Sequence, residues 1–287
     1  MTTAHLSPVT LAKRQQAQWA ARCGIAADAR GYVSALDDNL LLPLSDATAR
    51  DFTRGSGSEL DGKMRALHSS SALAVNVFEH WRQAGERTAL ADAFGLDRPI
   101  VDVRFEQQFD NHLPGMPPNL DVVLALDGGS IMAIESKFLE PYGRHVHGFK
   151  PKYFEALGAW TAHGLTACQS LADELQGDPT IYRWLHAEQL LKHIVGLAAS
   201  ARVPWTLLYL WYEVPGPEAS AHAEEVAAFA RQVSADGISF QALTYQVLLA
   251  GLRPRVTNED AEYVAYLEER YFAGDVGGSN APASSWR

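Results

Sequence analysis

Two charged residues, Glu135 and Lys137, stand two apart in a segment that is otherwise suited to a buried strand. Since side chains alternate between the two faces of a strand, both would point to one face and Ser136 to the other. The residues from Ile131 to Ile134 are apolar, so these charges would lie where burial costs free energy unless something compensates. A carboxylate and an ammonium in such surroundings are candidates for chemistry.

Asp121 is expected to approach this pair from the preceding strand. A tight turn at Asp127 to Ser130, whose two glycines can adopt positive φ, joins the strand-like runs 120–126 and 131–138. Counting outward from the turn of an antiparallel hairpin sets Asp121 opposite Glu135 or the residue after it. Two neighbouring carboxylates repel, so the pKa of one should rise unless a cation lies between them. Hard oxygen ligands suit Mg²⁺ or Mn²⁺.

Further elements must hold these strands in place. Hydroxyls at Ser69 to Ser71 precede a helix at Ala72 to Arg82, and a strand at Val101 to Phe109 completes a three-strand meander. A helix is expected at Tyr182 to Ala199, and the nearly continuous apolar run from Trp205 to Tyr212 suits a central strand buried on both faces. The remaining predictions are a helix at Glu224 to Val233, a short strand running into a helix at Ser239 to Tyr245, and a helix at Glu259 to Phe272.

The pattern D-x(13)-E-S-K, on a strand-turn-strand between two helices, resembles the PD-(D/E)XK nuclease superfamily, although Leu120 rather than proline precedes Asp121. The segments S-S-x-A-L-A-V-N-x-F, at Ser69 to Phe78, and E-S-K-F-x-E, at Glu135 to Glu140, resemble a bacterial branch of it. The resemblance covers roughly residues 65 to 215. It implies an α/β fold with a restriction-endonuclease-like core: a mixed central sheet that contains the meander, flanked by helices, with extra N-terminal and C-terminal helices.

The resemblance also implies roles for individual residues. Asp121, Glu135 and the main-chain carbonyl of Ser136 would hold one or two Mg²⁺ ions, for which Mn²⁺ can substitute, and Lys137 would orient or help deprotonate the attacking water. Gln189 resembles a glutamine that supports the lysine or the substrate in exonuclease-like members. The spacing places Gln189 in a polar strip of the later helix, together with Lys192, His193 and Gly196.

Three residues on flanking elements have two interpretations each. Glu79 could extend the metal site from the first helix or be an exposed helix carboxylate. Asn76 on the same helix is expected to be a structural hydrogen bonder rather than a ligand. Glu106 could be a further acid near the site, but an outward orientation is the expectation.

A basic and aromatic stretch from Tyr142 to Phe154 predicts a loop that contacts phosphates, with a solvated basic loop as the alternative. The residues expected to bind nucleic acid are Arg144, Lys150 and Lys152 in this loop and Lys192 on the later helix. His145 and His147 would share one face of an extended chain, but no cysteine or third histidine stands at ligand spacing, which disfavours zinc.

The length and composition of the chain indicate its class and its number of domains. With 287 residues and 47% hydrophobic residues, the chain can bury a large core. One domain is expected over residues 1–273, divided into an N-terminal elaboration (1–64), the core (65–215) and a C-terminal helical elaboration (216–273), followed by a disordered tail (274–287). Two cysteines make no disulfide framework, and neither a signal sequence nor a membrane-spanning run is apparent, so the cytoplasm is the expected location.

The net charge of -10 argues against non-specific coating of nucleic acid but leaves room for a local basic groove. We therefore expect metal-dependent phosphodiester hydrolysis of nucleic acid, with DNA as the substrate, in restriction, repair or defence. One alternative is an inactive nuclease-like domain that binds nucleic acid or a protein partner, and another is a structural cluster of ion pairs. No P-loop, G-x-G-x-x-G, H-E-x-x-H or G-x-S-x-G motif supports another reaction.

Overall fold

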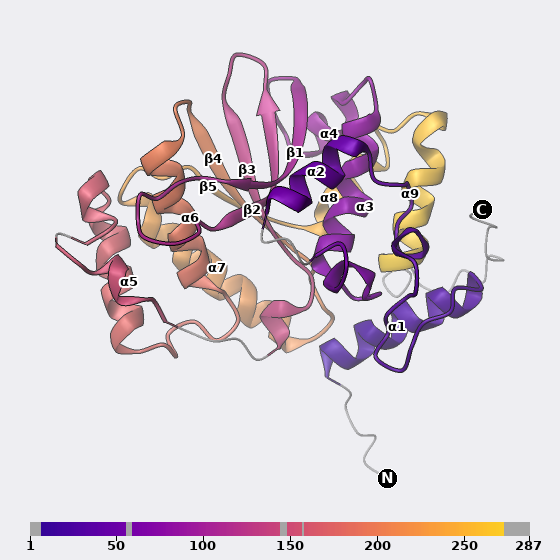
Figure 1. The fold of residues 1–287 in the computed structure, drawn as a ribbon, viewed down its shortest axis with the longest axis horizontal. Coiled ribbons are helices and arrows are strands. Elements are labelled where there is room, and N and C mark those ends of the chain that lie inside the picture. Colours follow the sequence, from indigo (N-terminus) through magenta and orange to yellow (C-terminus); the bar gives the residue numbers. More distant parts are fainter. Residues whose placement is uncertain (1–6, 56–58, 144–147, 157, 273–287) are drawn as a thin grey trace, which may run out of the picture.

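In this computed structural model, which describes residues 7–55, 59–143, 148–156 and 158–272, a five-stranded mixed sheet forms the centre of the molecule (Figure 1). The strands are β1 (Ile100–Gln108), β2 (Asn119–Leu126), β3 (Ile131–Lys137), β4 (Trp205–Trp211) and β5 (Phe240–Thr244). Their order in the sheet is the order in the chain. The first three are antiparallel, whereas β3, β4 and β5 run parallel. The predicted meander and mixed sheet are confirmed.

Helices cover both faces of the sheet. They are α1 (Pro8–Arg22), α2 (Asp46–Arg54), α3 (Ser70–Gln83), α4 (Thr88–Ala93), α5 (Thr166–Gly177), α6 (Ala187–Ser200), α7 (Pro217–Ser234), α8 (Tyr245–Leu252) and α9 (Ala261–Leu267), which continues as a π-helical turn, Glu268–Phe272. Core residues of α3, α4, α8 and α9 pack on one face, and those of α5, α6 and α7 on the other. The fold is therefore a three-layer α/β/α arrangement.

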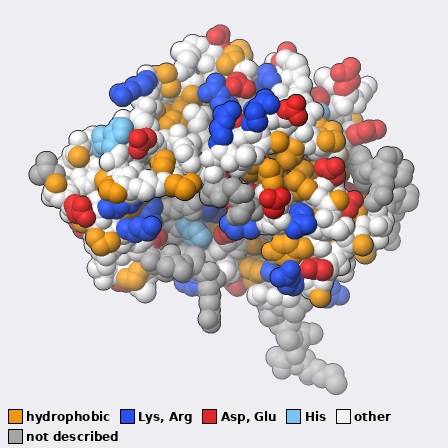
Figure 2. Space-filling view, viewed as in Figure 1, with side chains coloured by type: hydrophobic (Ala, Val, Ile, Leu, Met, Phe, Trp, Pro, Cys, Tyr) orange, Lys and Arg blue, Asp and Glu red, His pale blue; other side chains and the backbone are white. Residues whose placement is uncertain are grey.

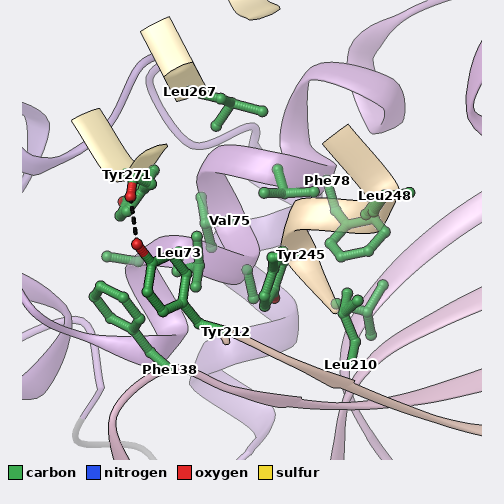
Figure 3. Close-up of a cluster of buried hydrophobic side chains, with 14 of the residues drawn as sticks. Leu73, Val75, Phe78, Phe138, Leu210, Tyr212, Tyr245, Leu248, Leu267 and Tyr271 are labelled. Carbon is green, nitrogen blue, oxygen red and sulfur yellow. Dashed lines mark hydrogen bonds between the residues drawn. The ribbon is translucent and has the colours of Figure 1, made fainter. Parts of the chain in front are cut away.

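The central strand β4 is buried on both faces, as its apolar run predicts. Leu208 and Leu210 belong to the core under α3 and α8, whereas Leu207 and Tyr209 belong to the core under α6. Figure 3 shows the first of these cores, in which the Tyr212 hydroxyl donates a hydrogen bond to the Tyr271 carbonyl at 2.7 Å. The C-terminal turn is thereby attached to the end of β4.

Helices α5 and α6 differ from the sequence expectation, and at the start of each helix a distant carboxylate accepts main-chain hydrogen bonds. Helix α6 begins at Ala187 rather than Tyr182, since the main-chain N–H groups of residues 183–185 donate to the carboxylate of Glu225. Helix α5 was not predicted, and the carboxylate of Asp236 accepts hydrogen bonds from its first turn, at Ala167 and Cys168. No local sequence signal marks a cap that comes from a distant part of the chain.

The N-terminal and C-terminal helices pack on the same side of the sheet as α3. The guanidinium of Arg270, in the C-terminal turn, lies 4.2 Å from the ring centroid of Trp19 in α1 and donates a hydrogen bond to the carbonyl of Asn39 at 2.8 Å. The predicted tail, residues 274–287, lies outside the described residues. Within the described ranges, no helix combines the length and the apolar character that crossing a membrane requires.

Candidate active site

The hairpin register brings Asp121 of β2 beside Glu135 of β3. Val122 pairs with Ile134, so the next position sets the two acids opposite each other. The main-chain N–H of Ser136 donates a hydrogen bond to Asp121 Oδ2 at 2.7 Å. The register expected from the Gly-Gly turn is confirmed.

Strand alternation places Glu135 and Lys137 on one face, where α6 covers them. The Lys137 ammonium donates hydrogen bonds to Glu135 Oε1 and, at 3.0 Å, to Gln189 Oε1. The Ser136 hydroxyl instead meets the Tyr245 hydroxyl at 2.6 Å in the core of the opposite face. Glu135 is 1% exposed and Lys137 7%, so water does little to stabilise these charges. They are stabilised by each other and by side chains of α6 instead.

The charge states follow from burial and from neighbouring charges. Burial alone would raise the pKa of Glu135, but Lys137 and then His193 lower it to about 2. Burial opposes the charge of Lys137, yet the carboxylates of Glu135 and Asp121 raise its pKa. Burial and then the charge of Glu135 raise the pKa of Asp121 well above its usual range. A cation near Asp121 would lower the free-energy cost of ionising this carboxyl group.

His193 is a site residue whose role the sequence did not predict. Its Nε2 lies 2.8 Å from Glu135 Oε2, and both side chains are 1% exposed. His193 and Gln189 are four residues apart on α6, so one face of the helix reaches both Glu135 and Lys137. The polar strip on this helix was the available signal, but the strip faces the buried acid rather than solvent.

Glu106 of β1 lies on the other side of Asp121. The pairs on either side of it, Phe105 with Val122 and Gln107 with Leu120, set Glu106 opposite Asp121. Its φ of 49° is in the left-handed region that glutamate rarely adopts. Its Oε2 accepts a hydrogen bond from Asn119 Nδ2 at 2.8 Å, and it lines the same cleft as Asp121. The expected outward orientation is therefore wrong, and the structure supports a further acid at the site.

A cleft of about 710 Å³ opens above the acids. Its lining includes Asp121, Lys137 and Gln189. Lys63, His68 and the N-terminus of α3 at Ser69 to Ser71 also contribute. A ligand in this cleft would reach Asp121 and Lys137 directly.

The oxygen donors of this site suit a divalent cation in kind. Within the described residues, no group of three or more His, Cys, Asp or Glu side chains is arranged so that it could hold a metal ion. Mg²⁺ nevertheless takes only one or two carboxylates from a protein and keeps several waters. The two oxygens of Glu135 contact Lys137 and His193, yet a carboxylate has about four acceptor positions, so capacity remains. Asp121 and Glu135 therefore fit such an ion, and the Ser136 carbonyl remains a predicted ligand.

Glu79 does not belong to this site, which corrects the expectation that it extends a metal centre. Its carboxylate accepts hydrogen bonds from the Ser45 main-chain N–H at 2.8 Å and from the Thr48 hydroxyl. Ser45 is the N-cap of α2, so the charge of Glu79 stabilises the positive end of that helix. It is 1% exposed, so the alternative of an exposed carboxylate is also wrong. Asn76 bonds the main chain of Leu41, as expected of a structural residue.

The described lysines of the predicted binding surface lie close together. Lys192 Nζ is 5.0 Å from the Phe149 ring centroid, and Lys152 Nζ is 5.3 Å from that of Tyr153. Burial and the charges of Lys150 and Lys152 lower the pKa of Lys192. The predictions for Arg144 and for His145 and His147 lie outside the described residues.

The mixed sheet, its flanking helices and the Asp121, Glu135 and Lys137 site define a restriction-endonuclease-like protein. The sequence model of the family described as "Restriction Endonuclease associating with ARP" matches residues 12–272, and the chain belongs to this family. Neither the curated proteins nor the solved structures contain a match to the chain. The match runs from α1 to the C-terminal turn and supports a nuclease-type function.

The structural role of Glu79 can be tested with Glu79→Ala. Because this change leaves the buried donors at the start of α2 without an acceptor, we expect a loss of about 2 to 3 kcal/mol in the free energy of unfolding. The affinity for Mn²⁺ should not change. Urea unfolding and calorimetric titration measure the two effects, and the exposed Glu262→Ala is the matched control. A weakened Mn²⁺ affinity in folded Glu79→Ala would return this residue to the metal site.

The charge of Asp121 should destabilise the metal-free protein at neutral pH. Its pKa is higher in the folded than in the unfolded chain, so stability is lost as the pH rises from the unfolded pKa through the folded pKa. We expect Asp121→Asn to have a higher urea midpoint than the wild type at pH 7 in EDTA, with the difference shrinking toward acid pH. The exposed Asp92→Asn should shift little. A lower midpoint for Asp121→Asn at pH 7 would contradict this charge balance.

Proposed function

We propose that this protein hydrolyses phosphodiester bonds of nucleic acid in a metal-dependent reaction, with DNA as the expected substrate and restriction, repair or defence as the context. The observation that carries the proposal is the buried Glu135 and Lys137 pair beside Asp121 under an open cleft. Burying these charges costs free energy, and apolar residues would fill the same space at lower cost. Membership of a restriction-endonuclease family supports the same chemistry.

Each residue of the site has a distinct task in this reaction. Asp121 and Glu135, with the Ser136 carbonyl, would hold Mg²⁺ or Mn²⁺. The bound ion would lower the pKa of a water molecule and balance the charge of the phosphate. Lys137, held between Glu135 and Gln189, would donate a hydrogen bond to the attacking water or to a phosphate oxygen. Its raised pKa favours this task of orienting donor over that of a base.

The substrate would approach on a face that is locally basic despite the net charge of -10. Figure 2 shows Lys and Arg side chains on the viewed face of the molecule, interspersed with Asp and Glu side chains. Lys150, Lys152 and Lys192 would contact the sugar-phosphate backbone. The ammonium groups of Lys152 and Lys192 lie over the rings of Tyr153 and Phe149. Contacts of this kind give affinity without reading sequence.

The catalytic assignment is tested by Asp121→Asn, Glu135→Gln and Lys137→Met. Each should lower kcat for Mg²⁺-dependent cleavage by at least about 100-fold, because each removes a charge that acts on the reacting phosphate or water. Cleavage of single-stranded DNA, double-stranded DNA and RNA should be measured, with circular dichroism to confirm folding. The exposed Lys13→Met is the matched control.

Full activity in Lys137→Met would refute the assignment. A wild-type protein that cleaves none of the three substrates would favour the alternative, a nuclease-like domain that binds nucleic acid or a protein partner.

The binding surface is tested by changing Lys150, Lys152 and Lys192 together to glutamine. The affinity for DNA should fall, and the slope of log affinity against log salt should become shallower by about 2 to 3, since each phosphate contact releases about one counterion. The Mn²⁺ affinity should stay the same. Three exposed cations of α1, Lys13, Arg14 and Arg22, changed to glutamine are the control. If the salt dependence of DNA affinity is unchanged in the triple variant, these three lysines do not contact the substrate.

A further inference from the structure

His193 of α6 is a polar side chain of the site that the proposed reaction does not use. Its Nε2 lies 2.8 Å from Glu135 Oε2, while the Lys137 ammonium contacts Oε1. The two oxygens of one carboxylate are thus contacted by side chains from two elements, β3 and α6. Both His193 and Glu135 are 1% exposed, so water does not compete for this contact.

We propose that His193 is a positioning residue that fixes the orientation of the Glu135 carboxylate for binding the cation. The inference rests on the proposed function, because it concerns the same metal site. It assigns no contact between His193 and the substrate or the reacting atoms.

Lys137 cannot set the orientation of Glu135 by itself. An ammonium on a four-carbon stem is a compact charge with rotatable donors, so it attracts a carboxylate without fixing its plane. An imidazole is a rigid ring with two nitrogens in fixed directions. Outer ligands that hold a metal-binding group in this way are a general feature of metal sites.

Close packing fixes the backbone of α6, so that His193 is held in position beside Glu135. Gly196 lies three residues after His193, and a Cβ at Gly196 would stand only 2.7 Å from the carbonyl oxygen of Phe109. The helix therefore packs directly against the chain that follows β1. Gln189, one turn before His193, binds Lys137, so α6 contacts both charged partners of β3.

A role in packing alone does not explain a histidine at this position. Among the described residues, neither ring nitrogen of His193 nor Glu135 Oε2 makes a hydrogen bond, so the 2.8 Å approach of Nε2 to Oε2 is a close polar contact. An unsatisfied buried nitrogen costs about 1 to 3 kcal/mol, a cost that leucine would avoid while filling similar space. The benefit that offsets this cost is the contact of Nε2 with Glu135.

The test measures Mn²⁺ affinity by calorimetric titration of the full chain, together with kcat and KM for DNA. We expect His193→Leu to weaken Mn²⁺ binding and to lower kcat by about 10- to 100-fold each, with little change in KM. His193→Gln, whose amide nitrogen can stand near the position of Nε2, should restore both to within a few-fold of the wild type. His193→Asn, whose amide is too short to reach Glu135, should not.

His222→Leu is the matched control, because His222 is 0% exposed and hydrogen bonded to the Tyr209 hydroxyl at 3.0 Å. It should lower the Tm without changing Mn²⁺ affinity. A folded His193→Leu or His193→Asn that binds Mn²⁺ like the wild type would overturn the inference, and so would a His193→Gln as weak as His193→Asn.

Asp121→Asn distinguishes a failure of the proposed metal site from a failure of the positioning role of His193. If the wild type binds Mn²⁺ and Asp121→Asn does not, the metal site stands, and the His193 variants alone decide the inference. If the wild type binds no Mn²⁺, the proposed metal site fails and the positioning role fails with it.

Discussion

Glu135 carries a negative charge at a position that water barely reaches, and the rest of the site is arranged around that charge. Lys137 on the same strand supplies the opposite charge, and His193 on α6 contacts the second oxygen. Gln189 holds the lysine in turn. An uncompensated buried carboxylate would cost several kcal/mol of folding free energy. The four side chains therefore depend on one another, and moving α6 away would leave Glu135 without one of its partners.

The topology of the sheet explains why α6 is the helix that completes this unit. Strands β3 and β4 are parallel, so the chain must cross over a face of the sheet between them, and α5 and α6 form that crossover. Helix α6 therefore covers the face to which Glu135 and Lys137 point. The β2–β3 hairpin sets Asp121, on the neighbouring strand β2, opposite Glu135.

Glu79 and Asp121 differ in the groups that surround their carboxylates. Glu79 is surrounded by hydrogen-bond donors at the start of α2 and stabilises the fold. Asp121 instead lies beside another carboxylate, in surroundings that raise its pKa, and its neighbour Glu106 has a strained backbone. Strain and like-charge repulsion are tolerated where function uses them, and both occur at this cleft.

The sequence alone determined the local features: the alternation that joins Glu135 to Lys137, the turn that brings Asp121 to them, and the order of the main strands. Strand periodicity and turn chemistry act over a few residues, so they can be read without the fold. The tertiary structure alone decided that His193 contacts Glu135, that Glu79 accepts hydrogen bonds at the start of α2, and where α5 and α6 begin. These features depend on contacts between segments far apart in the chain, and no local pattern encodes which distant side chain will satisfy a buried charge or a free helix end.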